Sequence, residues 1–191
     1  MGYTHHWERK GNALDPVRFK QFSADCKNVC LRTEIPLANW NGTGKPVFSA
    51  TRVIFNGVKR CGHTWRDLGV TWPAPQAVGG VTLGATPVGT WCAGAYIPSR
   101  TCDGSCAHET FMITQHEDQV PWRQGEDWLF SFCKTAYKPY DLLVTACLII
   151  YKQYYGEQVH ISSDGKSRDW DDARRICQHV LGYGADFTLK A

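Results

Sequence analysis

The longest apolar run of the chain covers residues 142–150 and is interrupted only by Thr145. It has about half of the roughly 20 apolar residues that a membrane-spanning helix requires. Pro139 is a favourable residue for a helix start, and Gly156 is a favourable residue for a helix end. The run therefore predicts a strongly apolar helix over residues 139–155 of a soluble protein, and it argues against a membrane span.

The rest of the chain changes between the hydrophobic period of strands and that of helices. The predicted strands cover residues 3–7, 51–57, 111–115, 128–133 and 159–163. The other predicted helices run from 15 to about 32 and from about 169 to 182. Asn56 and Gly57 form a turn signal that is typical of antiparallel hairpins. We therefore expect an α+β fold, with a mostly antiparallel sheet on which three main helices pack.

Glycine, proline, cysteine and tryptophan residues interrupt any regular pattern over residues 58–107. A compact domain rarely carries so long a loop without structure, so we expect short strands or a metal to organise this part. The chain has 191 residues, a length typical of one domain. We expect a single domain over residues 1–191 that contains residues 58–107 as an irregular insertion.

The charge and the cysteine content restrict the partners and the compartment. The net charge of +3 comes from 21 basic and 18 acidic residues scattered along the chain, so we do not expect binding to duplex nucleic acid. The chain has nine cysteines and begins with a polar stretch without a hydrophobic signal region. We therefore expect a cytoplasmic protein with reduced thiols, which are buried small hydrophobes, metal ligands or catalytic groups.

Cysteine and histidine side chains in and next to the insertion have a spacing that zinc can use. Cys61 and His63 lie at its start, and Cys102 and Cys106 lie near its end. Thiolate and imidazole groups are the usual ligands of tetrahedral structural zinc. The alternative is a set of buried thiols in a loop-rich core, and this alternative requires no cofactor. We expect no cofactor, with structural zinc as the alternative.

A group of polar residues precedes and begins the apolar helix. Lys134 and Lys138 are followed by the helix start, and Thr135 and Tyr140 add hydroxyl groups. The free N–H groups and the dipole of a helix N-terminus attract anions, so this pattern predicts a seat for a phosphate or a carboxylate. The alternative is a pair of solvated lysines beside a helix whose dipole is complemented by Asp141.

The candidate acid and base groups are His5, His108, Glu109, Asp141, His160 and Asp164. His5 shares one face of the first predicted strand with Tyr3 and Trp7. If this face lines a cavity, the two rings can stack on a base or a sugar while the imidazole makes a polar contact. The alternative is a histidine inside an aromatic core. Asp164 ends a predicted strand, where a carboxylate faces a cleft or caps a turn.

Five segments together resemble a family of proteins from bacterial and phage genomes that begin with a Gly-Tyr-Thr-His-Tyr-Trp type of sequence. The segments are residues 2–7, 55–57, 108–111, 132–141 and 162–165, and His6 replaces the usual aromatic residue. The resemblance implies no specific activity. Its recurring motifs contain mostly polar residues, which suggests a site: Tyr3, His5, Trp7, Asn56, His108, Glu109, Lys134, Thr135, Lys138, Tyr140, Asp141 and Asp164.

Three functions follow from these patterns. The first is a pocket protein in which the face of His5 meets the start of the apolar helix across a hollow and binds a small anionic ligand such as a nucleotide. For a phage member in the host cytoplasm, we expect by analogy the sequestration or degradation of a signalling nucleotide, an anti-defence role. The second is an acid–base hydrolase of a phosphate- or sugar-containing substrate. The third is a zinc-stabilised protein-interaction module with residues 65–91 as its contact surface.

Overall fold

The computed structural model describes residues 3–33, 35–61, 77–78, 81–82, 104–117 and 127–189. In these ranges the chain forms three α-helices and three sheets whose paired strands are antiparallel. The expected α+β fold is confirmed. Most of the expected insertion over residues 58–107 lies outside the described residues, apart from its two ends and the short strands β5 (Ala77–Val78) and β6 (Val81–Thr82).

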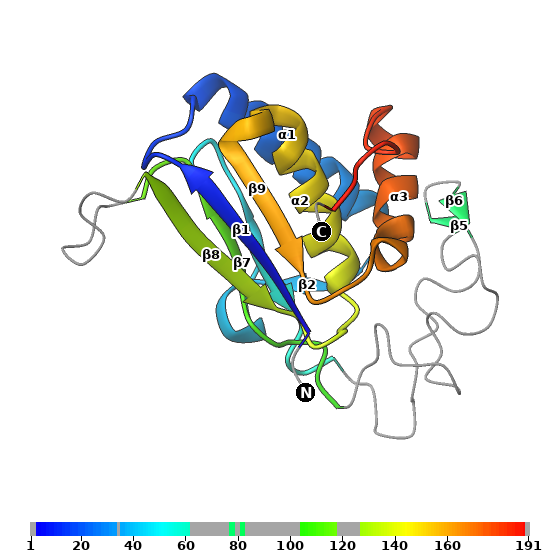
Figure 1. The fold of residues 1–191 in the computed structure, drawn as a ribbon. Helices are drawn as coiled ribbons and strands as arrows, with labels where there is room; N and C mark the ends of the chain where they lie inside the picture. Colours follow the sequence, from blue (N-terminus) through cyan, green and yellow to red (C-terminus); the bar gives the residue numbers. More distant parts are fainter. Residues whose placement is uncertain are drawn as a thin grey trace.

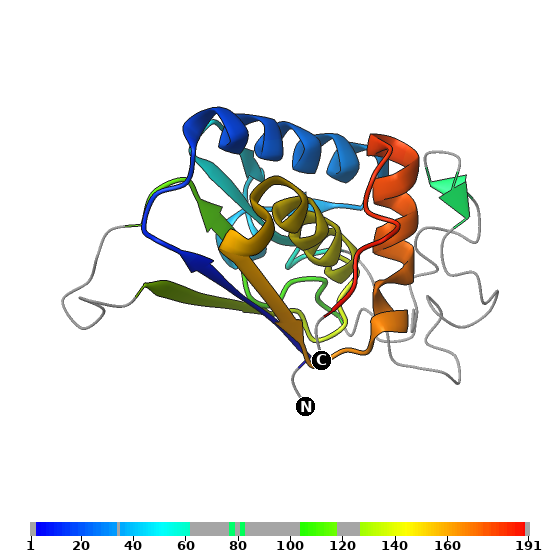
Figure 2. The ribbon, with the colours of Figure 1, turned by 45° about the horizontal axis from the view of Figure 1, so that its top comes forward.

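The predicted apolar helix is α2 (Asp141–Tyr155), and it is the centre of the molecule. Its side chains are apolar around most of the circumference, so the helix is buried on every side from its first residue to Tyr151. The helices α1 (Pro16–Thr33) and α3 (Asp171–Leu181) pack against it and against each other. Figures 1 and 2 show α2 enclosed by these two helices and by the strands. Among the described residues, no helix is long and apolar enough to cross a membrane.

The first sheet has the strand order β8-β1-β9 and joins the first strand of the chain to two strands from its last third. It consists of β1 (Thr4–Lys10), β8 (Trp128–Lys134) and β9 (Val159–Ser163). The inner face of this sheet turns towards α2 and carries buried side chains such as Trp7, while the outer face turns away from the helices (Figure 1). The period of two along each strand decides which residues belong to each face.

The second sheet has β4 (Arg52–Gly57) between β2 (Leu37–Ala38), β3 (Val47–Phe48) and β7 (Phe111–Thr114). It shares one hydrophobic core with the first sheet and the helices. Trp7 of β1 contacts Phe111 of β7 with a ring-centroid distance of 5.3 Å, and Phe111 contacts Phe55 at 4.9 Å. These aromatic contacts hold the two sheets together.

Five cysteines lie in this core as free, buried thiols: Cys26, Cys30, Cys133, Cys147 and Cys177. For these five, the interpretation of the cysteines as small buried hydrophobes is confirmed. Burial raises the pKa of the Cys26 thiol to about 11 and the pKa values of the other four above their ordinary range. These thiols are therefore protonated and unreactive at neutral pH.

Strand β9 forms one edge of the first sheet, and a lysine of α2 covers part of that edge. The Lys152 ammonium group donates hydrogen bonds to the carbonyl oxygens of Gly156 (2.7 Å) and Val159 (2.8 Å). The 3₁₀ turn Gly156–Gln158 connects α2 to β9 directly, so the lysine can reach the first residue of the strand.

Candidate functional site

Four polar side chains form a continuous hydrogen-bonded chain where β1, β9 and α2 meet. His5 Nε2 lies 2.7 Å from Asp141 Oδ1, and His5 Nδ1 lies 2.9 Å from Ser163 Oγ. The Thr135 hydroxyl donates to the same Asp141 oxygen at 2.6 Å. The carboxylate can only accept, so His5 donates through Nε2, and Nδ1 accepts the Ser163 proton when the ring is neutral. We call Ser163, His5, Asp141 and Thr135 the buried polar chain.

The buried polar chain closes the space in which we expected a ligand. His5 is 0% exposed and Asp141 is 2% exposed, and the two side chains are in direct contact. The start of β1 and the start of α2 are thus brought together as expected, but without the expected hollow between these side chains. Buried polar groups that satisfy each other contribute to a unique packing of the core.

The rings of Tyr3 and Trp7 are also buried, and they do not form an open platform. Tyr3 stacks on Tyr137 at 3.7 Å, and Trp7 packs into the core shared by the two sheets. The physical reason is the strand period. Tyr3, His5 and Trp7 share one face of β1, and this face is the inner one because its large apolar rings gain most from burial.

A strained turn connects β8 to α2. Ala136 and Tyr137 have φ angles of 49° and 56°, in the left-handed region that non-glycine residues rarely adopt. The Tyr3 carbonyl oxygen accepts hydrogen bonds from the N–H groups of Thr135 (2.9 Å) and Ala136 (3.2 Å), and the Lys138 N–H donates back to the Thr135 carbonyl oxygen (3.0 Å). These bonds hold the turn in place, and the turn directs the Thr135 hydroxyl towards Asp141. Strain of this kind costs about 1–3 kcal/mol per residue.

The predicted residues Lys138 and Tyr140 lie beside this turn, inside the protein. Both are buried, so neither forms the solvated pair or the open anion seat that we considered. The Tyr140 hydroxyl donates to the Glu109 carbonyl oxygen at 2.6 Å. Burial raises the pKa values of Tyr140 and Tyr3 far above the ordinary range, so both phenols remain protonated.

A second polar network joins the two sheets next to the buried polar chain. The Glu109 carboxylate accepts the Lys134 N–H at 2.7 Å, and His108 Nδ1 donates to the Lys134 carbonyl oxygen at 2.8 Å. Asn56 fixes the backbone of His108 from both sides: its Nδ2 donates to the His108 carbonyl oxygen (2.8 Å) and its Oδ1 accepts the His108 N–H (3.1 Å). Glu109 and Asn56 therefore organise the backbone at this junction.

Asp164 has a similar role at the end of β9. Its Oδ2 accepts the Thr4 N–H at 3.0 Å, while its own N–H donates to the Thr4 carbonyl oxygen at 3.0 Å. The residue itself is exposed. This contact joins the end of β9 to the start of β1, so it is neither a cap of the local turn nor a position on a described cleft.

The predicted zinc ligands are only partly described. Cys61 and Cys106 belong to the described residues, whereas His63 and Cys102 lie outside them. Within the described ranges, no group of three or more histidine, cysteine and acidic side chains is arranged to hold a metal ion. A zinc site formed by these four residues stays a prediction.

The outer face of the first sheet carries an exposed set of aromatic rings that the sequence analysis missed. Phe130 and Phe132 are 43% and 52% exposed although both belong to a strand. His6 stacks on Phe130 at 5.7 Å, and His160 stacks on Trp128 at 4.1 Å. We call these five residues, from all three strands, the outer aromatic face.

The strand register explains how these rings come together. Phe132 pairs with His6, and His6 pairs with Ser162 on the other side of β1. The next row consists of Phe130, Glu8 and His160. Each row thus presents an aromatic residue of β8, a polar residue of β1 and a polar or histidine residue of β9 to solvent.

Charged groups lie at the centre and at the ends of the outer aromatic face. In the middle, the Glu8 carboxylate lies 3.9 Å from His160 Nδ1, an ion pair when the histidine is protonated. At the ends, Lys10 pairs with Trp128, and Lys134 follows Phe132 by two residues on the same face. The middle of the face therefore suits the rings of a ligand, and the lysines at its two ends suit the anionic groups of a ligand.

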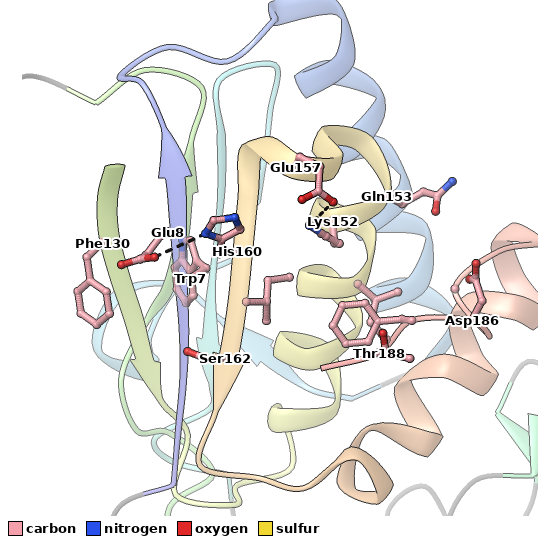
Figure 3. Close-up of a pocket in the computed structure, with 14 residues that line it drawn as sticks. Trp7, Glu8, Phe130, Lys152, Gln153, Glu157, His160, Ser162, Asp186 and Thr188 are labelled. Carbon is pink, nitrogen blue, oxygen red and sulfur yellow. Dashed lines mark ion pairs between the residues drawn. The ribbon is translucent and has the colours of Figure 1, made fainter. Parts of the chain in front are cut away.

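A cleft of about 720 Å³ begins at this face and continues around the edge strand β9. Figure 3 shows Phe130, Glu8 and His160 on its sheet side and Lys152 on its helix side. Lys152 is bound to two carbonyl oxygens and lies 3.6 Å from Glu157. The cleft also contains Asp186, so it has more carboxylates than ammonium groups and does not suit a phosphate.

The missed residues had a weak signal in the sequence. In residues 128–134 the alternate positions Leu129 and Cys133 are apolar, and so are Trp128, Phe130 and Phe132. Because both sets are apolar, the pattern cannot tell which set is buried. The pairing with β1 decides it, since Cys133 pairs with the inner residue His5.

Comparisons of the chain with protein-family models, with curated proteins and with solved structures find no match. The geometry and chemistry of the outer aromatic face and of the buried polar chain are therefore the basis for a function.

Proposed function

We propose that this protein binds a small anionic ligand of the nucleotide class on the outer aromatic face. The base stacks on Phe130 and Phe132, and the phosphate lies beside Lys134. The observation that carries this proposal is the exposure of two adjacent phenylalanine rings, 43% and 52%, on a strand that ends in a lysine. An exposed cluster of large rings is uncommon on soluble proteins and marks a binding surface.

The arrangement of the rings supports a flat, aromatic ligand. Phe130 and Phe132 lie two residues apart on one strand, with their ring centroids 6.1 Å apart and their planes tilted by 34°. Stacking on such rings tolerates any base, because each base has a π-face, and contributes about 1–3 kcal/mol per base. His6, stacked on Phe130, extends the apolar surface and adds a polar ring edge.

The charges support an anion at one end of the face. Lys134 lies beyond Phe132 and is half-buried, so its position is restricted by its neighbours. Glu8, in the middle, repels a phosphate, and its carboxylate lies 3.9 Å from His160 Nδ1. Of the anion seat expected from the sequence, Lys134 is retained in this proposal, whereas the rings of Tyr3 and Trp7 are replaced by rings from the opposite face.

Calorimetry with a panel of mono-, di- and cyclic nucleotides tests the proposal. We expect binding that Phe132→Ala weakens at least about 5-fold, the low end for one base–ring contact. Lys134→Ala keeps its backbone hydrogen bonds and should weaken nucleotides but not the corresponding nucleosides. The matched control is Met112→Ala, since Met112 is 40% exposed on the other sheet. Absence of binding, or equal binding by Phe132→Ala, would contradict the proposal.

A hydrolase is the second candidate, because the buried polar chain has a half-buried hydroxyl at one end. Ser163 Oγ, His5 and Asp141 are linked in the order nucleophile, base and orienting carboxylate. The ring nitrogens are reversed relative to the usual serine hydrolases, and Ser163 Oγ also accepts the Gly165 N–H at 2.9 Å. Release of phosphate or sugar from ester substrates, lost in Ser163→Ala without a change in unfolding, would support this activity. No turnover of any substrate would remove it.

A further inference from the structure

We infer that the outer aromatic face is a track for single-stranded nucleic acid and that its ligand has several nucleotides rather than one. This inference rests on the proposed function, since the same rings stack on the bases. It adds that several bases bind, that the nucleic-acid strand runs along β8, and that duplex nucleic acid is excluded.

The number of rings exceeds what one base needs. Trp128, Phe130 and Phe132 occupy alternate positions of one strand, which places their Cα atoms about 7 Å apart in sequence order and about 14 Å from first to last. One base covers one or two of these rings. His6 of β1 and His160 of β9 stack on Phe130 and Trp128 and widen this row of rings. Successive bases of one nucleic-acid strand can stack on the ring faces that remain open along β8.

The charged groups suit a nucleic-acid strand that runs along the row of rings and has phosphates near its two ends. Lys134 and Lys10 lie at opposite ends of the row of rings, next to Phe132 and Trp128. The Glu8–His160 pair lies between them, where a phosphate is repelled and a base edge can form hydrogen bonds. An antiparallel sheet with stacked bases over its surface is a known way to bind single-stranded RNA.

A duplex does not fit the same surface, because its bases are stacked on each other and present only their edges in the grooves. Duplex binding depends mainly on phosphate contacts by basic side chains. The chain has a net charge of only +3, and its described outer face has two lysines opposed by one glutamate. Stacking must therefore provide most of the affinity, and only unpaired bases can stack on these rings.

Fluorescence anisotropy with thymidine oligonucleotides of increasing length tests the track. We expect the affinity to rise at least about tenfold from the mononucleotide to an oligonucleotide of four to six residues, because each added base contact contributes roughly 5- to 150-fold. A hairpin duplex with a stem of about six base pairs and a loop without bases should bind at least about tenfold more weakly. The double variant Phe130→Ala with Phe132→Ala should lose at least about tenfold on the oligonucleotide.

A second pair of variants separates stacking from general apolar contact. Phe130→Leu with Phe132→Leu keeps apolar side chains but removes the π-faces, and we expect most of the loss seen with alanine. Met112→Ala, with its exposed side chain on β7, should bind as the original protein does. Circular dichroism of each variant checks that the fold is kept.

The outcomes separate this inference from the proposed function. Mononucleotide binding without any gain from length overturns the track and leaves the nucleotide site. Equal affinity for the hairpin duplex, or equal affinity of the leucine variant, also overturns the track. A failure of both mononucleotides and oligonucleotides to bind removes the inference and the proposed function together.

Discussion

The inner and outer faces of the first sheet are made by the same three strands, but the inner face buries polar side chains whereas the outer face exposes aromatic rings. On the inner face the unusual residue is the polar His5. It is buried and hydrogen-bonded to Ser163 of β9 and to Asp141 of α2, and Asp141 also accepts a hydrogen bond from the buried Thr135. On the outer face the unusual residues are apolar rings, and Phe130 and Phe132 remain open to solvent.

This difference indicates which face stabilises the fold and which face binds a ligand. A polar group in the core is costly unless it is paired, and here it is paired, so the inner face stabilises the fold. A large ring on the surface gives up burial energy, and the tilted contact with Phe130 still leaves Phe132 52% exposed. The inner face therefore stabilises the fold, whereas the exposed rings of the outer face are suited to binding a ligand.

The largest effect should follow from Asp141→Ala on the inner face. The substitution leaves His5 Nε2–H and the Thr135 hydroxyl without their common acceptor in the core. We expect the free energy of unfolding to fall by about 3 kcal/mol or more, measured by urea denaturation. The matched change on the outer face is Glu8→Ala, which should cost about 1 kcal/mol or less, since its pair with His160 is half-exposed. Equal losses of unfolding free energy in the two variants would contradict the difference between the two faces.

The next effect is a loss of stability at alkaline pH, which comes from the core and not from the outer face. Burial raises the pKa of Cys26 from 9.0 to about 11, so the folded state holds this proton more tightly than the unfolded state. The stabilisation is complete below pH 9 and is lost as the pH rises from 9 to 11, by about 1.4 kcal/mol per pH unit. Urea midpoints between pH 7 and pH 10, with a reducing agent, measure it.

The variant Cys26→Ala is the control for this alkaline loss, because it removes one of the buried thiols. Its urea midpoint should fall less steeply above pH 9 than that of the original protein. Midpoints that stay constant from pH 7 to pH 10 in the original protein would contradict the assignment to buried thiols.

A smaller effect, of the opposite sign, should follow from Ala136→Gly. Ala136 has a left-handed φ of 49°, and glycine adopts this conformation without the steric cost of about 1 kcal/mol. We expect the variant to be up to about 1 kcal/mol more stable in urea denaturation. Ala107→Gly is the control, since Ala107 has no positive φ, and it should be less stable than the original protein. Destabilisation by both glycines would show that the turn has no strain to release.

The smallest effect on stability should come from the outer aromatic face itself. Phe132 is 52% exposed, so Phe132→Ser removes little buried area and should change the free energy of unfolding by about 0.5 kcal/mol or less. The same variant should lose nucleotide binding in calorimetry. A large loss of stability would show that this ring is structural and would remove the contrast between the two faces.

The parts that could be predicted from the sequence are those with one clear hydrophobic pattern. The apolar helix was expected over residues 139–155 and is found as α2, and Tyr3, His5 and Trp7 do share one face of β1. The strand period places three residues on one face but does not say whether that face borders a hollow or another side chain. That answer depends on the contact between His5 and Asp141, which are 136 residues apart in the chain.

The outer aromatic face could not be predicted for a related reason. Residues 128–134 are apolar on both sides of the strand, so the exposed set is decided by the partner strand and not by the segment. The strained turn was missed because Ala136 and Tyr137 are not residues that favour a left-handed backbone. Both features depend on long-range pairing, which local patterns do not contain.

The hydrogen bonds of Lys152 to the carbonyl oxygens of Gly156 and Val159 have a consequence for the behaviour of the protein at high concentration. An open edge strand offers hydrogen bonds to any other extended chain and thereby promotes aggregation. Because an ammonium group already occupies the start of β9, a foreign strand would have to displace it and bury its charge. The lysine thus protects the protein from edge-to-edge association at the start of β9.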